Sequence, residues 1–298
     1  MALNNPAFNN PAFQDPRAVQ TYPGGSRAAG LGGAAQYAPP AAATSAQLEG
    51  MYASPSAGAQ QTDRMTVEDT VYKTIALFAV LLVAAVGGWI WTMAGVTAAN
   101  PNPNMAPLLI GTIGGFVLAM VNIFKKKVSV PLIIGYALFE GLFIGGISAF
   151  FEFLWPGIVI QATLGTVSVV GVTLALFASG KIRASKRATK IFMIAMVGYL
   201  VFSLLNVGLM LFGVLPPDQM FGLSSARIFG IPLGLILGVL VVIMAAYSLV
   251  LDFDQIQRGV RNGAPRQFAW KAAFGIMVTV VWLYVEILRM IAIVRGSN

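Results

Sequence analysis

Four acidic residues in or beside long apolar segments are the side chains of this sequence most able to do chemistry. They are Glu140, Asp252, Asp254 and Glu286. A carboxylate inside a bilayer segment costs about 2.5 kcal/mol or more to insert, so such groups usually face the bundle interior and line ion or proton pathways. At 1.5 Å per residue, Glu286 lies about 22 Å along its segment from Lys271, and Glu140 lies about 14 Å into its own segment. Both are therefore expected well inside the membrane.

Each of these carboxylates also has a structural interpretation. Asp252 and Asp254 close their segment, and a solvated helix end beside a basic loop would explain them as well as a functional site. Glu286 could form an ion pair with Arg289, three residues later on the same helix face. Glu140 has no nearby cation in its own segment, and a structural role in which a tyrosine or asparagine satisfies it is the alternative.

Two asparagines are the other polar side chains expected inside the bundle. Asn122 and Asn206 both lie within apolar segments, where interhelical hydrogen bonding is the more common role. We keep both, with Glu140, Asp254 and Arg289, as candidate residues of an ion pathway.

The composition is that of an integral membrane protein. Of 298 residues, 57% are hydrophobic and 10% are charged, so a water-soluble globule is excluded. The chain has no cysteine and no histidine, which excludes disulfides, the usual zinc sites and histidine-dependent proteolysis. A retinal protein would need a lysine within its last helix, and Lys271 lies only at the edge. We therefore expect no enzymatic activity and no cofactor, and any bound metal would be a hard cation such as calcium held by oxygen ligands.

Seven apolar segments of membrane length predict an all-α fold with seven transmembrane helices. They lie at about 72–96, 105–124, 131–151, 157–178, 190–213, 230–251 and 271–294. Thr66 is the expected N-cap of the first helix. We expect residues 65–298 to form the transmembrane domain and residues 1–64, which open with the repeat NNPAF at 4–8 and 9–13, to form a disordered tail.

The basic residues predict the orientation of these helices. They gather in the loops after the second, fourth and sixth segments, whereas the three opposite loops hold only Arg227. The positive-inside rule then places the tail in the cytoplasm and the C-terminus outside. Glycine pairs at four-residue spacing, such as Gly111/Gly115 and Gly141/Gly145, indicate close helix packing.

Two short motifs resemble the Bax inhibitor family of seven-helix membrane proteins, most of all its bacterial YccA-type branch. LDFDQI keeps that family's aspartate of the sixth helix, Asp252, four residues before Ile256. WLYVEIL matches the motif of the seventh helix, with Glu286 in place of the usual aspartate. Two further departures are Arg289, one turn later, and a longer spacing between Asp252 and Glu286. The similarity covers about residues 70–295.

The resemblance implies both an architecture and a function. A central seventh helix would be surrounded by two three-helix layers, in a bacterial inner membrane. Asp252 and Glu286 would form a pH-sensing carboxylate pair that gates a cation leak, with calcium as the permeant ion and the two acids as its candidate ligands. Two carboxylates within hydrogen-bonding distance would share a proton. The alternative is a regulator that binds a membrane protease or another membrane protein, with the tail as the binding segment.

Overall fold

The computed structural model describes residues 63–216 and 220–296, and in these ranges it confirms an all-α fold with seven helices long and apolar enough to cross a membrane. Apart from them, the described residues form one short 3-10 helix, η4 (Gly222–Ser225), and a two-stranded hairpin of β1 (Arg227–Ile228) and β2 (Ile231–Pro232). The seven helices are α3 (Val67–Met93), α4 (Ala106–Phe124), α5 (Val130–Leu154), α6 (Ile158–Ala178), α7 (Lys186–Leu211), α8 (Leu233–Arg261) and α9 (Phe268–Gly296).

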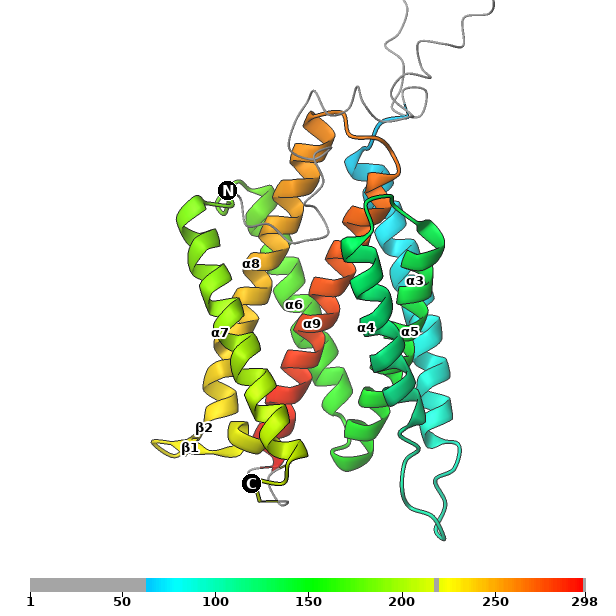
Figure 1. The fold of residues 1–298 in the computed structure, drawn as a ribbon, viewed down its shortest axis with the longest axis vertical. Helices are drawn as coiled ribbons and strands as arrows, with labels where there is room; N and C mark the ends of the chain where they lie inside the picture. The colour runs from blue at the N-terminus through cyan, green and yellow to red at the C-terminus, as the bar shows by residue number, and fades with distance from the viewer. Residues whose placement is uncertain (1–62, 217–219, 297–298) are drawn as a thin grey trace, which may run out of the picture.

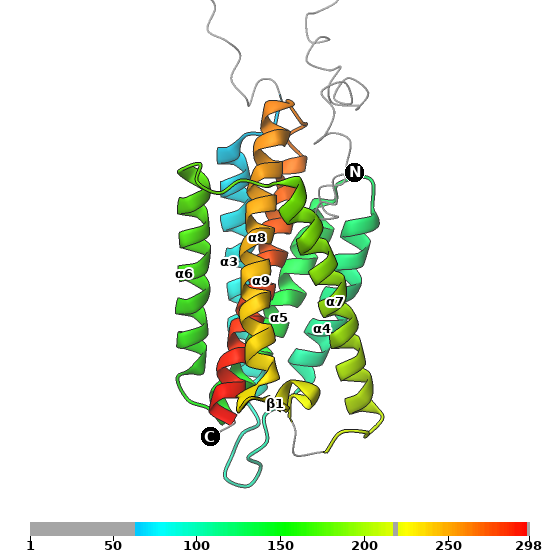
Figure 2. The same cartoon turned by 90° about the vertical axis from the view of Figure 1, so that its left-hand side faces the viewer.

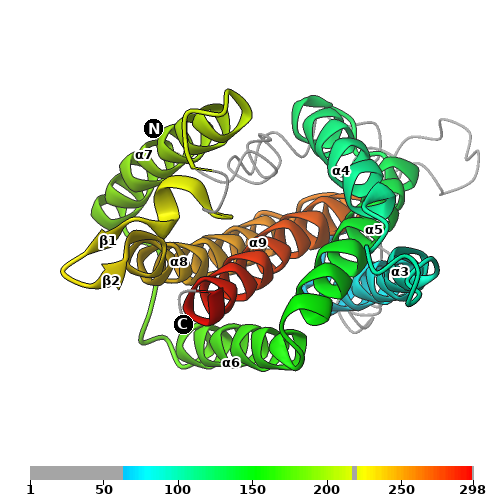
Figure 3. The same cartoon turned by 90° about the horizontal axis from the view of Figure 1, so that it is seen from below.

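The central position of the seventh helix is confirmed. In Figure 3 the helix α9 crosses the middle of the bundle, and it packs against α3, α5, α6 and α8. Helices α3, α4 and α5 pack on one another and form one layer, while α8 contacts both α6 and α7 and joins them into the second. Much of α9 is therefore covered from several directions, which makes this helix a natural place for a buried functional group.

Glycines make the first layer tight, as their spacing predicts. Gly141 and Gly145 of α5 face Leu81 and Ala85 of α3, and a Cβ on either glycine would overlap a backbone carbonyl oxygen of α3. Gly111 of α4 meets the backbone of α5 in the same way. Backbones that approach so closely gain dispersion contacts, which are a main source of helix association in lipid.

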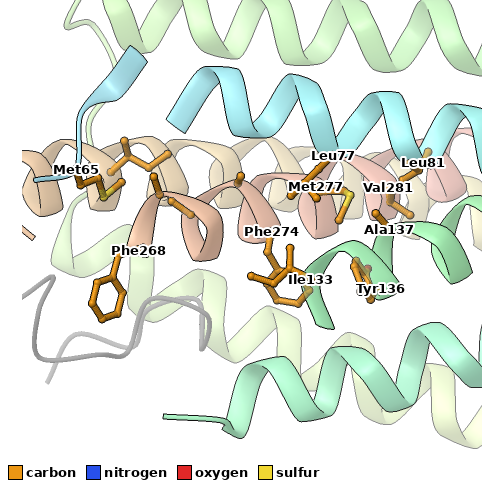
Figure 4. Close-up of a cluster of buried hydrophobic side chains, with 14 of the residues drawn as sticks. Met65, Leu77, Leu81, Ile133, Tyr136, Ala137, Phe268, Phe274, Met277 and Val281 are labelled. Carbon is orange, nitrogen blue, oxygen red and sulfur yellow. The ribbon is translucent and has the colours of Figure 1, made fainter. Parts of the chain in front are cut away.

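The main apolar core lies where α3 and α5 meet the first half of α9. Leu77 of α3, Ile133 of α5 and Met277 of α9 are each at most 2% exposed and lie close together in Figure 4. The ring of Tyr136 packs edge-on against Phe274, with 4.9 Å between their centroids. This core anchors α9 to the first layer.

Helix α7 is attached differently from the others. None of its residues is buried, and many of its apolar side chains are exposed. Polar contacts hold it at both ends: Thr189 and Tyr247 of α8 share a hydrogen bond of 2.9 Å, and Asn206 accepts one of 2.7 Å from the backbone N–H of Leu223. A third contact, at Tyr199, reaches the central helix and is part of the candidate site.

All three basic loops lie at one end of the bundle, which we call the basic end. The α4–α5, α6–α7 and α8–α9 connections lie there with the start of α3, whereas the C-terminus and the β hairpin lie at the opposite end (Figures 1 and 2). The alternation of the helices thus brings the predicted cationic loops together. Their cationic residues are Lys125, Lys126, Lys127, Lys181, Arg183, Lys186, Arg187, Lys190, Arg258, Arg261, Arg266 and Lys271.

The start of α3 is fixed to the α8–α9 loop at the basic end. Thr66 caps the helix, as predicted, by accepting a hydrogen bond of 3.1 Å from the backbone N–H of Asp69. The backbone N–H of Met65 donates to the carbonyl of Ala264 at 2.7 Å. The predicted tail 1–64, including its NNPAF repeat, lies outside the described residues except for Asp63 and Arg64, and Arg64 forms a β-bridge to Pro265. The described part of the chain therefore starts two residues before the expected transmembrane domain.

Candidate functional site

Asp252 lies inside helix α8 and not at its end. The helix continues beyond Asp252 to Arg261, and Asp252 is 0% exposed, so the interpretation of this residue as a solvated helix end is wrong. The hydroxyl of Thr279 on α9 donates a hydrogen bond of 2.7 Å to its Oδ2 atom. The hydroxyl of Ser248 lies 3.4 Å from that of Thr279. The carboxylate is thus buried between α8 and the central helix.

Gln255 completes a small group of polar side chains here, which we call the Asp252 cluster (Ser248, Asp252, Gln255 and Thr279). Gln255 follows Asp252 by three residues on the same face of α8 and is 3% exposed, and neither of its amide atoms has a protein partner. The cluster offers carboxylate, amide and hydroxyl oxygens, the ligands that hard cations such as calcium prefer. It has a single carboxylate, and the described residues contain no group of three or more acidic side chains able to hold a metal. Such a site suits a cation held briefly better than a resident metal.

Glu286 lies in a second group of polar side chains, which we call the Glu286 cluster (Tyr199, Ser224, Glu286 and Arg289). Glu286 and Arg289 belong to α9, Tyr199 to α7 and Ser224 to η4. Arg289 forms the predicted ion pair with Glu286, using two guanidinium nitrogens. The Tyr199 hydroxyl donates to Glu286 Oε2 at 3.0 Å, and Arg289 also donates to the Ser224 hydroxyl at 3.3 Å. Glu286 is 3% exposed, so its charge is balanced by a cation and a tyrosine away from bulk solvent.

The structure does not bring Asp252 and Glu286 together, so the expected proton-sharing pair is not formed. Asp252 faces Thr279, and Glu286 lies seven residues further along α9, about 10 Å away along the helix axis. On α8, Glu286 lies beside Gly238, where an added Cβ would lie 3.3 Å from the Oε1 atom. The physical reason is the register of the α8–α9 hairpin, because both helices extend beyond the predicted segments toward the turn at 262–267.

The two clusters nevertheless lie on the same interface. Seven residues are almost two full turns, so Thr279 and Glu286 share one face of α9. Between the clusters the interface is apolar: Val241 and Ala245 of α8 and Leu283 of α9 are all 0% exposed. The two polar clusters thus lie one above the other along α8 and the central helix, separated by buried apolar side chains.

Comparison with known proteins shows the family of this chain. Residues 5–296 match the family model described as Bax inhibitor 1 like, and this range includes both clusters. The chain belongs to the Bax inhibitor 1 like family. No curated protein and no solved structure matches it.

In this Bax inhibitor 1 like protein Glu140 lies apart from both clusters, in the first layer. Its carboxyl lies against Gly115 of α4, where an added Cβ would be 2.8 Å from Oε2, and it interacts with the hydroxyl of Tyr136 one turn earlier. The absence of a side chain at Gly115 makes room for the carboxyl between α4 and α5. Glu140 is therefore satisfied by a tyrosine, which is the structural alternative that the sequence left open.

The remaining candidates have structural partners in the described chain. Asp254 forms an ion pair with Arg258, four residues later on α8. Asn122 donates to the carbonyls of Leu118 and Leu132, at 2.9 and 3.1 Å, and so joins α4 to α5. Asn206 joins α7 to η4 through the bond to Leu223 described above and a second bond, to the Phe221 carbonyl. These contacts give both asparagines the role of interhelical hydrogen-bonding residues.

Sequence reasoning missed Tyr199, Thr279 and Gln255. Tyr199 and Thr279 each stand alone in an apolar segment, and no spacing marks either as the partner of a carboxylate. Gln255 lies inside the motif LDFDQI, whose resemblance to the family pointed to the region but not to this residue. The pairing of α7, α8 and α9 in space identifies Tyr199 and Thr279, and the burial of its unpartnered amide identifies Gln255.

Proposed function

We propose that this protein is a pH-sensitive cation leak, with calcium as the best-fitting ion, whose path follows the interface between α8 and α9. The observation that carries the proposal is the burial of two carboxylates on one face of that interface, in a protein that spans the membrane several times. Ionisable groups inside a membrane are costly, and they are usually retained where ions or protons pass.

The Asp252 cluster is the proposed binding step. When Asp252 is ionised, its carboxylate, the two hydroxyls and the Gln255 amide present oxygen atoms to an entering cation. When Asp252 is protonated, the negative charge that attracts the cation is lost. The flux should therefore depend on pH through this residue.

The Glu286 cluster is the proposed gate. Tyr199 and Arg289 bind the ionised form of Glu286, and protonation would weaken both interactions. Tyr199 belongs to α7, the helix without buried residues, so the loss of this bond would free the middle of α7 to move. Movement of α7 and α8 would open the apolar interface at Val241 and Ala245, between the two clusters. In this mechanism Asp252 and Glu286 do not share a proton; they titrate separately and are coupled through helix packing.

We also propose that the protein lies in a bacterial inner membrane with its basic end in the cytoplasm. The support is the grouping of the cationic loops at one end of the bundle, because positively charged loops are retained on the cytoplasmic side. The C-terminus would then lie outside.

Calcium flux into proteoliposomes tests the proposal. Purified protein would be reconstituted with a calcium indicator inside the vesicles. The initial rate of calcium entry would be measured from about pH 6 to 8, because a gate that works in the cell must respond near neutral pH. Glu286→Gln keeps the size of the side chain and its hydrogen bond to Tyr199 but removes the charge. We expect this variant to have a weaker pH dependence than the wild type, because only Asp252 still titrates. Glu68→Gln, at an exposed glutamate in the first turn of α3, is the matched control and should behave as the wild type.

Two outcomes would count against the leak. A Glu286→Gln protein with wild-type flux and wild-type pH dependence would remove the gate from this cluster. No flux at any pH, from protein shown to be folded, would instead favour the regulator of a membrane protease or another membrane protein. Co-purification with and without residues 1–62 would then show whether the tail binds the partner.

A further inference from the structure

A cavity of about 790 Å³ opens at the basic end, away from the α8–α9 interface. It lies between the α4–α5 loop, the start of α3 and the first turn of α9. Lys126 and Lys127 of the loop form one wall, and Lys73 of α3 and Arg266 of the α8–α9 loop form the other. Trp270 of α9 lines it as well. Four cationic side chains thus surround one hollow.

The charge of this cavity is positive after the acidic neighbours are counted. Asp69 pairs with both Lys73 and Arg266, so one carboxylate serves two cations. Asp63 on the cavity wall is a second acidic group. Lys126 and Lys127 are exposed and bring the cationic side chains around the cavity to four, against two carboxylates. The cavity therefore attracts anions.

Its position matches the headgroup level of a bilayer. Trp270 stands in the first turn of α9, immediately before the apolar stretch of that helix, and tryptophan is enriched where helices leave the hydrocarbon core. Lys73 lies over the Trp270 ring, with its ammonium 5.6 Å from the ring centroid, which holds the lysine beside the cavity. Val130 at the start of α5 also lines the hollow, and the side chain of its N-cap residue, Ser129, makes no capping hydrogen bond. The N-terminal end of a helix favours a negative group nearby.

We propose that this cavity binds the phosphate group of an anionic phospholipid. Basic pockets between membrane helices on the cytoplasmic side recognise such headgroups. A soluble phosphate would satisfy the same lysines and arginine, but the cavity opens where a lipid phosphate already lies, and the lipid supplies its own anchoring. Occupation by a headgroup would clamp the α4–α5 loop to the α8–α9 hairpin that carries the candidate ion pathway.

Native mass spectrometry of the full-length protein tests the site. The protein in detergent would be given equal amounts of phosphatidylglycerol and phosphatidylcholine with the same acyl chains, and we expect phosphatidylglycerol to be retained selectively. Lys126→Gln/Lys127→Gln should lower the affinity for phosphatidylglycerol about 25-fold, about fivefold for each lysine at a membrane surface. Lys186→Gln/Lys190→Gln makes the same charge change at exposed lysines at the start of α7 and should keep wild-type binding.

The outcomes separate the sources of phosphate. Equal loss of phosphatidylglycerol in both double variants, or no loss in the first, would overturn the site, because a general surface charge would then explain the binding. Thermal stabilisation of the wild type by inorganic phosphate, lost in Lys126→Gln/Lys127→Gln and without any preference for phosphatidylglycerol, would overturn the lipid as the ligand and assign the site to a soluble anion. Both double variants alter exposed side chains, so size-exclusion profiles should confirm that they fold.

Discussion

Removing Arg289 should destabilise the protein more than neutralising its partner, Glu286. In the ion pair the side chain of Glu286 is 4% exposed and that of Arg289 is 21% exposed. Arg289→Met leaves a buried carboxylate without its cation, and breaking a buried pair from one side costs about 3–5 kcal/mol. Glu286→Gln keeps an acceptor for Tyr199 and leaves Arg289 bound to Ser224, so the loss is that of one charge-assisted hydrogen bond, about 1.5–3 kcal/mol.

A double-mutant cycle measures this coupling. The free energy of unfolding would be determined for the wild type, Arg289→Met, Glu286→Gln and the double variant, by reversible denaturation in mixed micelles. We expect the double variant to be more stable than the sum of the two single effects predicts, by about 2 kcal/mol or more, since it contains no unpaired charge. Arg261→Met, at an exposed arginine of the last turn of α8, should change stability by less than about 0.5 kcal/mol. If the effects of the two single substitutions on the free energy of unfolding add to that of the double variant within about 0.5 kcal/mol, Glu286 and Arg289 do not stabilise each other as a buried pair.

Two further predictions concern helix packing and orientation. Gly145→Ala should cost about 2 kcal/mol or more, because its Cβ would overlap the backbone carbonyl of Ala85, whereas Gly171→Ala has open space and should be neutral or slightly stabilising in the same unfolding assay. Because the chain contains no cysteine, single cysteines report topology without background: Lys126→Cys should be protected from a membrane-impermeant maleimide in intact cells and Asn102→Cys should be labelled, and the reverse pattern would invert the proposed orientation.

The sequence predicted the helices far better than the geometry between them. Runs of apolar residues mark what lies in the hydrocarbon, so all seven helices were expected, whereas the central place of the seventh was implied by the family resemblance. The end of α8 was not predicted, because this helix continues past its apolar run into a polar, charged stretch that includes Arg258 and Arg261. Hydropathy has no signal for a helix that projects beyond the membrane. The extension moves the turn and with it the register that decides what Asp252 faces.

The candidate site shows the same division. Glu286 and Arg289 are neighbours on one helix, so their ion pair followed from local spacing alone. The contacts of Asp252 with Thr279 and of Glu286 with Tyr199 join different helices, and no periodicity in one segment encodes them. Asp69 is a similar case: its position in the first turn of α3 suits the helix dipole, but its bonds to Arg266 depend on the α8–α9 loop reaching the start of α3.

The most direct test of the proposed ion path compares two aspartates that lie two residues apart on α8. Asp252 is fully buried against α9, whereas Asp254 is ion-paired with Arg258 on the same helix. Both would be changed to asparagine, and calcium flux into proteoliposomes would be measured at matched protein density from about pH 6 to 8, a range that spans neutral pH. If ions pass along the α8–α9 interface, Asp252→Asn loses most of the flux and its pH dependence, while Asp254→Asn keeps both. Wild-type flux in Asp252→Asn, or equal loss in the two variants, would contradict this ion path.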